Sequence, residues 1–118
     1  MRDFQKLFIW QRSHEITLKI YNCTKVFPSA ELYSLTSQMR RSAYSIPTNI
    51  AEGCGRKTLR ELNRFRAIAA GSTSELQYQL ILAKDLGYLN ENLFNELYIE
   101  TIEIRKMIFA FSQKLERS

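Results

Sequence analysis

The chain has 118 residues, 45% of them hydrophobic and 25% charged, and its 17 lysines and arginines against 12 acidic residues give a net charge of +5. The length fits a single domain spanning residues 1–118, and the composition excludes a disordered or collagen-like chain. No apolar run approaches the roughly 20 residues of a membrane-spanning helix, and the opening segment lacks a secretory pattern, so we expect a cytoplasmic protein without membrane contact.

The spacing of apolar residues predicts a first helix from Phe4 to Phe27. Its apolar stripe consists of residues that are mostly three, four or seven apart: Ile9, Ile16, Ile20, Cys23 and Phe27. Pro28 interrupts this helix, and Ser29 is expected to cap a second helix that runs to Glu52. The two helices are therefore expected to be joined by a short connection.

The second helix contains a proline inside its apolar stripe. That stripe has steps of three or four residues: Leu32, Leu35, Met39, Ala43, Ile46 and Ile50. Pro47 removes one backbone donor, so we expect a kink instead of a break, with Ser45 satisfying the freed backbone. Gly53 is expected to adopt the left-handed conformation that follows a helix end.

A capping box formed by Thr58 and Glu61 predicts the start of a third helix, which continues to about Leu86. Its stripe again has steps of three and four residues: Leu62, Phe65, Ala69, Ser72, Leu76, Leu80 and Ala83. Gly71 lies in a run of small side chains, and its low helix propensity suggests that another helix crosses closely there.

Gly87 is expected to end the third helix and Asn90 to cap a fourth. The core stripe of the fourth helix is expected to be Leu97, Thr101, Ile104, Ile108, Phe111 and Leu115, and a second apolar row contains Tyr98, Ile102 and Phe109. Four helices with short connections predict an all-α, antiparallel up-and-down four-helix bundle. One core cannot bury both rows, so the second row is either a set of scattered exposed residues or a subunit interface, and we favour self-association.

The excess positive charge lies in residues 40–66, where seven cations face only Glu52 and Glu61. The candidate nucleic-acid-binding residues in this segment are Arg40, Arg41, Arg56, Lys57, Arg60 and Arg64. Arginine is suited to phosphate, and a row of cations four residues apart would bind a phosphate backbone without base specificity. The alternative is a solvated face with exposed ion pairs. Arg40 and Arg41 either join the same patch or pair with acidic residues of a neighbouring subunit.

No catalytic or metal-binding pattern is visible. His14 is the only histidine and has no second ligand at metal spacing, while Ser45, Asn49 and Glu52 lack an adjacent base and are interpreted as structural. We therefore predict a protein that is not an enzyme and holds neither cofactor nor metal.

The cysteines and several aromatic residues also receive structural interpretations. Cys23 and Cys54 are expected to be free thiols, since nothing indicates export. Tyr44, Tyr78 and Phe65 could stack on bases, but aromatic residues at helical spacing are more often core.

Three segments carry a family resemblance: QMRRSAYSIPTNIAEGCGR at 38–56, RFRAIAAGSTSEL at 64–76 and LGYL at 86–89. The chain resembles the four-helix-bundle proteins encoded in intervening sequences of bacterial 23S ribosomal RNA genes, which are also labelled S23 ribosomal proteins. The resemblance implies assembly into a closed ring, commonly a homopentamer. Relatives include accessory proteins of diversity-generating retroelements, so it implies RNA, DNA or a reverse transcriptase as partners.

Residues and resemblance together lead to two functional hypotheses. The first is a non-enzymatic, oligomeric helical bundle that binds RNA or DNA through a basic surface, as an accessory to another nucleic-acid-handling protein. A ring of five subunits would carry about five times the charge of one chain and so a stronger field. The second hypothesis is a protein–protein interaction scaffold whose cations serve subunit contacts or an acidic partner.

Overall fold

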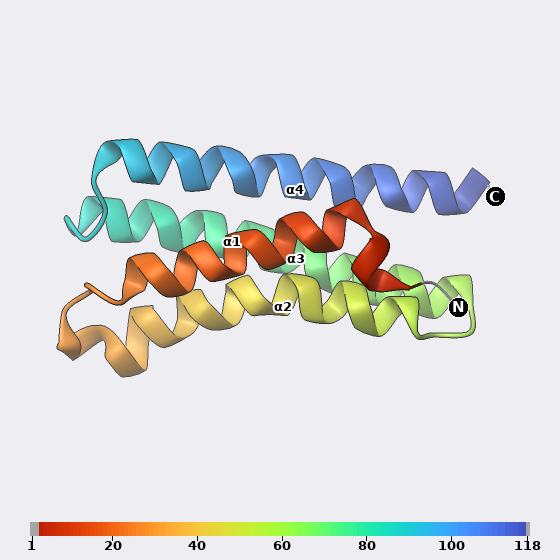
Figure 1. The fold of residues 1–118 in the computed structure, drawn as a ribbon, viewed down its shortest axis with the longest axis horizontal. Coiled ribbons are helices and arrows are strands. Elements are labelled where there is room, and N and C mark those ends of the chain that lie inside the picture. Colours follow the sequence, from red (N-terminus) through yellow and green to blue (C-terminus); the bar gives the residue numbers. More distant parts are fainter. Residues whose placement is uncertain (1–2, 118) are drawn as a thin grey trace.

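Four long helices packed along one another form the molecule (Figure 1). The computed structural model describes residues 3–117, with side chains described for residues 3–111. The helices are α1 (Phe8–Thr24), α2 (Ser37–Cys54), α3 (Leu59–Asp85) and α4 (Glu91–Arg117). Each runs antiparallel to the next, and α1 also contacts α4, which closes the bundle. The predicted all-α, antiparallel four-helix bundle is confirmed, and residues 3–117 contain no strand.

The first helix is shorter than predicted. A 3₁₀ helix, η1 (Phe4–Lys6), precedes it, and the extended backbone of Leu7 separates the two helices. α1 therefore begins at Phe8 instead of Phe4, and it ends at Thr24, three residues before Phe27. The apolar stripe alone did not reveal these ends, because residues outside the helix still pack against the same core.

The start of the second helix also differs from the prediction. The 3₁₀ helix η2 (Ser29–Glu31) and the π-helix η3 (Leu32–Thr36) lead into α2. Ser29 does not cap a helix, since Pro28 holds the capping position of η2 without a side-chain hydrogen bond. The wider π turn interrupts the regular helical phase, and Leu32, predicted to be core, is 45% exposed.

The core is built from the predicted stripes of all four helices. Its fully buried apolar residues are Ile16, Ile20, Met39, Ala43, Ile46, Ala69, Leu76, Leu80, Ala83, Leu97, Ile104 and Ile108. Removal of this apolar surface from water is the main force that holds the helices together. Phe65 and Ser72 of the predicted stripes are only half-buried, and Leu115 lies outside the residues whose side chains are described.

Pro47 is buried inside α2, and a neighbouring helix compensates for its missing donor. A proline cannot donate to the carbonyl four residues earlier, which here is that of Ala43. The hydroxyl of Thr17 on α1 lies 3.1 Å from this Ala43 oxygen and 2.7 Å from the Ser13 oxygen of its own helix, so its one proton is shared between the two carbonyls. Ser45 does not fulfil this role, contrary to the prediction; its hydroxyl accepts hydrogen bonds from Asn49 and from Ser72 instead.

Local signals at the ends of α3 and α4 predicted the structure correctly. The hydroxyl of Thr58 accepts a hydrogen bond from the N–H of Glu61 at 3.2 Å, and Asn90 Oδ1 accepts one from the N–H of Leu93 at 2.8 Å. Gly87 follows α3 with a φ of 83°, a left-handed conformation that favours glycine. These capping predictions are confirmed.

Two other glycines have roles different from those predicted. Gly53 lies inside α2 without a positive φ, and a Cβ there would lie 2.9 Å from Leu62 Cδ1 and 3.2 Å from Phe65 Cβ. The close helix crossing is therefore between the end of α2 and the start of α3. It is not at Gly71, where a Cβ would meet no atom within 4 Å.

Candidate nucleic-acid interface

The turn between α2 and α3 gathers four of the six predicted cations at one end of the bundle (Figure 1). Arg56, Lys57, Arg60 and Arg64 are all exposed, and we call them the basic hairpin. Arg56 and Lys57 lie in the turn itself, while Arg60 and Arg64 lie one turn apart on the same face of α3. The sequence spacing and the close crossing at Gly53 together place these cations near one another.

Phe65 supports two guanidinium groups of the basic hairpin. Those of Arg56 and Arg64 lie 4.8 Å and 5.9 Å from the centre of its ring. Arg56 also donates to Glu52 Oε2 at 3.1 Å, in an exposed pair of a kind worth less than about 1 kcal/mol. Among the described residues, no carboxylate pairs with Lys57, Arg60 or Arg64. Most of this positive charge is thus open to an external anion.

Arg40 and Arg41 lie elsewhere on α2. Arg41 precedes Arg56 by about 15 residues, which corresponds to roughly 22 Å along a helix. Arg40 Nε donates to the Thr24 hydroxyl at 2.9 Å, and its guanidinium group lies 4.9 Å from the centre of the Tyr21 ring. Arg40 therefore braces α2 against α1. Arg41 is exposed and makes no ion pair with a described residue of its own chain.

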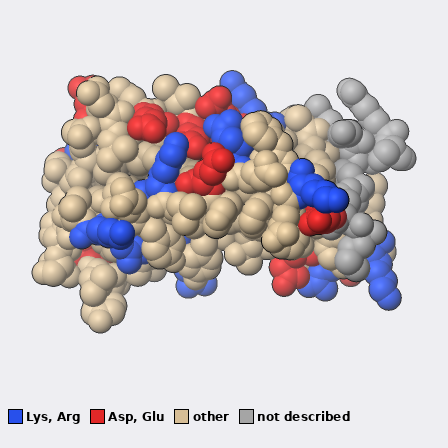
Figure 2. Space-filling view, viewed as in Figure 1, with Lys and Arg blue, Asp and Glu red and all other residues tan. Residues whose placement is uncertain are grey.

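Carboxylates gather on the first half of α4, away from the basic hairpin (Figure 2). Lys19 Nζ lies 3.0 Å from Glu100 Oε2 and 3.6 Å from Glu96 Oε1, and Arg12 pairs with Glu103 at 3.4 Å. The hydrogen bond to Glu100, only partly opposed by desolvation, raises the pKa of Lys19. These pairs join α1 to α4 and partly neutralise the carboxylates there.

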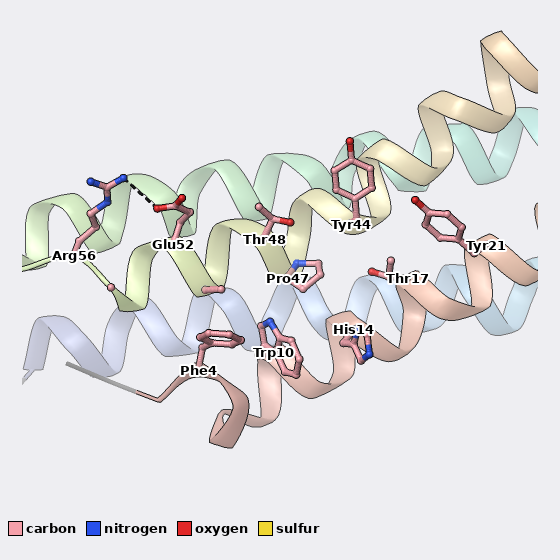
Figure 3. A pocket seen from close by; sticks show the side chains of 12 residues that line it. Phe4, Trp10, His14, Thr17, Tyr21, Tyr44, Pro47, Thr48, Glu52 and Arg56 are labelled. Carbon is pink, nitrogen blue, oxygen red and sulfur yellow. Dashed lines mark hydrogen bonds and ion pairs between the residues drawn. The ribbon is translucent and has the colours of Figure 1, made fainter.

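A groove of about 920 Å³ between α1 and α2 adjoins the basic hairpin, and the sequence did not predict it (Figure 3). Its aromatic lining consists of Phe4, Trp10, His14, Tyr21 and Tyr44. The rings of Trp10 and His14 are stacked, with centres 5.1 Å apart and planes 9° apart, and Phe4 meets Trp10 edge-on at 5.1 Å. Glu52 and Arg56 line the end of the groove nearest the basic hairpin.

The spacing of the aromatic residues was a partial signal for this groove. Trp10, His14 and Tyr21 are four and seven residues apart, so they share one face of α1 next to its core stripe. Aromatic residues at helical spacing were interpreted as core, and that was wrong for Tyr44 and Tyr78, which are 45% and 62% exposed. Only the packing of α1 on α2 determines which rings remain accessible.

A second groove, of about 470 Å³, lies between α3 and α4. Ile102 and Phe109 of the second apolar row line it together with Arg66, Arg105 and Lys106. Phe109 is 63% exposed, so the single core leaves part of this row uncovered. The groove combines apolar and cationic side chains.

The two cysteines, Cys23 and Cys54, are both buried, and burial raises the pKa of Cys23 to about 11. Among residues 3–111, no three His, Cys, Asp or Glu side chains are grouped so that they could hold a metal ion. Within the same part of the chain, no helix is both long and apolar enough to cross a membrane.

Comparisons with known proteins match nearly the whole chain. A family model described as 23S rRNA-intervening sequence protein matches residues 5–110. A solved structure from Bacteroides thetaiotaomicron, described as a protein with unknown function from the S23 ribosomal protein family, is similar with a TM-score of 0.80 and 20% sequence identity. That match covers 88% of this chain and 97% of the other. No curated protein matched the chain.

Proposed function

Since the chain belongs to the family of 23S rRNA-intervening sequence proteins, we propose that it binds RNA or DNA in the cytoplasm through phosphate contacts of the basic hairpin, without catalysing a reaction. The observation that carries this proposal is the set of exposed cations at the α2/α3 turn, of which only Arg56 is paired with a carboxylate. The family description names 23S rRNA, which fits a polyanionic partner.

The geometry of the basic hairpin suits a phosphate backbone. Phe65 limits the freedom of Arg56 and Arg64, so less conformational entropy is lost when they bind. Each guanidinium group offers five N–H donors, of which Arg56 uses one for Glu52. Such contacts supply affinity and salt dependence but do not select a base sequence.

We also propose that the protein acts as a homo-oligomer, with five subunits as the expected number, and as an accessory to a nucleic-acid-handling protein such as a reverse transcriptase. The exposed Phe109 in the second apolar row supports self-association. Native mass measurement at several ionic strengths tests the subunit number. A monomer at all concentrations would contradict this part of the proposal.

A second candidate function is a protein-interaction scaffold. The groove between α3 and α4 favours it, because Phe109 offers an apolar contact while Arg105 and Lys106 offer charge for an acidic partner. In this case nucleic acid would not bind even at low salt.

The test is a salt titration of binding to a labelled RNA strand, with Arg56, Arg60 and Arg64 all replaced by serine. A control that replaces Lys25, Arg105 and Lys106 by serine removes the same charge elsewhere. Each lost phosphate contact to a single strand lowers the slope of log affinity against log salt by about 0.7, so the hairpin variant should lose about 2. The control should lose much less.

Two results would contradict the nucleic-acid proposal. One is the absence of binding by the unmodified protein at low salt. The other is equal weakening in the hairpin variant and its control, which would mean that net charge alone matters. Circular dichroism should show that both variants keep their helices, because all six replaced side chains are exposed.

A further inference from the structure

The groove between α1 and α2 lies directly beside the basic hairpin and shares Arg56 with it. We propose that this groove binds unpaired bases of a single-stranded nucleic acid, which stack on its aromatic side chains while the basic hairpin holds the adjoining phosphates. This inference rests on the proposed function and specifies the form of nucleic acid that the protein prefers.

The α1 side of the groove carries aromatic rings over an extended distance. Trp10 and His14 form a stacked pair, and Tyr21 lies further along the same helix (Figure 3). From Trp10 to Tyr21 the helix advances roughly 17 Å, which equals the length of about five nucleotides of a stacked strand. Base stacking on aromatic rings tolerates any sequence, since every base has a π-face.

The α2 side adds an exposed ring and hydrogen-bonding groups. Tyr44 is 45% exposed and lines the groove opposite α1, with Thr48 and Glu52 following it along α2 (Figure 3). The edges of unpaired bases carry both donors and acceptors, which hydroxyl and carboxylate groups can meet. The lining therefore offers partners for both the face and the edge of an unstacked base.

Charge complementarity favours a nucleic acid as the occupant. Arg56 stands at one end of the groove, and at the other end the guanidinium group of Arg40 lies over the Tyr21 ring. Arg40 donates to Thr24 and to the carbonyl of Tyr21, which leaves further N–H donors unused. Cations at both ends of an aromatic strip match a strand whose phosphates flank its bases.

The floor of the groove is fixed before any ligand arrives. Pro47 and Thr17 both line it, and the hydrogen bond from Thr17 to the Ala43 carbonyl ties α1 to α2 beneath the rings. A site that is already formed loses less conformational freedom on binding. In a duplex the bases are already paired and stacked, so a duplex would gain only the phosphate contacts.

The experiment compares single strand with duplex. A labelled oligo-deoxythymidine strand of about 12 nucleotides and a duplex of the same length are titrated at about 50 mM salt. Trp10 is the only tryptophan, so its fluorescence should be quenched by the strand and not by the duplex. Tyr44→Ala should weaken strand binding by about fivefold or more, with duplex affinity and the salt slope unchanged.

Two control variants separate stacking from general effects. Tyr44→Phe keeps the ring and should bind the strand within about twofold of the unmodified protein. Tyr78→Ala removes a more exposed tyrosine that does not line the groove, and it should have no effect. Native mass measurement of Tyr44→Ala should show the same subunit number as the unmodified protein.

The outcomes distinguish this inference from the proposed function. If strand and duplex bind equally and Trp10 stays unquenched, while the hairpin variant weakens both, the inference fails and the proposed function stands. If neither nucleic acid binds at low salt, both fail. A changed subunit number in Tyr44→Ala would overturn the inference, because it would assign the groove to a second copy of the chain.

Discussion

Replacing Thr17 by valine tests whether α1 supplies the hydrogen bond that Pro47 removes from α2. Thr17 is 7% exposed and Ala43 is fully buried, so water cannot easily replace the lost donor. A buried carbonyl without a partner costs about 1–3 kcal/mol, and valine has nearly the volume of threonine, so no cavity is added. We expect the free energy of unfolding to fall by this amount.

A double-mutant cycle isolates that hydrogen bond. In a Pro47→Ala background, residue 47 regains an N–H that can donate to the Ala43 carbonyl within α2. In that background Thr17→Val should lower the free energy of unfolding by at least about 1 kcal/mol less than it does in the protein with Pro47. Thr17→Ser keeps the hydroxyl and removes one methyl group, so it should cost about 1 kcal/mol in both backgrounds.

Urea unfolding followed by circular dichroism at 222 nm measures all six proteins. The measurements use one protein concentration, because any association would add to the apparent stability. If Thr17→Val costs the same beside proline and beside alanine, within about 0.5 kcal/mol, the hydrogen bond between the helices does not compensate for Pro47, and the reasoning is refuted.

The remaining predictions concern helix packing, thiol chemistry and pH. Gly71→Ala should stabilise the bundle by about 1 kcal/mol in urea unfolding, because alanine at an exposed helical position raises helix propensity without a clash. Gly53→Ala should stabilise the bundle less or destabilise it, because its Cβ would lie too close to α3. The reverse order would place the close crossing at Gly71. Burial raises the pKa of Cys23 to about 11, so the thiol is protonated at pH 8. Cys23 should therefore react with a thiol reagent only as fast as the protein unfolds. Rapid reaction of Cys23 in the folded protein would contradict its burial. Hydrogen bonds from Ser34 and then Tyr88 lower the pKa of Glu31, so the stability they confer is present above its ordinary value of 4.5 and lost as pH falls through the folded value. The difference in stability between the unmodified protein and Tyr88→Phe should therefore be larger at neutral pH than in acid, and a difference independent of pH would contradict this linkage.

Features that depend on a few neighbouring residues could be predicted from the sequence. The caps at Thr58 and Asn90 and the left-handed Gly87 were correct, because each depends on the local backbone alone. The core stripes were also largely correct, since burial of one helix face requires a period of 3.6 residues. The prediction that Leu32 is buried was wrong because a π turn, which no residue pattern indicated, shifted the helical phase.

Features that depend on contacts between helices were harder to predict. The roles of Gly53 and Gly71 could not be told apart, because a close helix crossing depends on where the helices meet. The compensation of Pro47 by Thr17 required the register of α1 on α2. The clustering of Arg56 and Arg60 followed from their short separation, whereas the position of Arg40 over Tyr21 required the packed structure.

The unpaired cations at the α2/α3 turn distribute the charge unevenly and give the bundle an electric dipole moment. The basic hairpin lies at one end of a body with a long axis of 46 Å, and Glu96 and Glu100 lie on the part of α4 near the other end. In the field of a polyanion such a body experiences a torque that turns its positive end forward. At 0.1 M salt this field is screened beyond a Debye length of about 10 Å, so the orienting effect acts only at shorter separations.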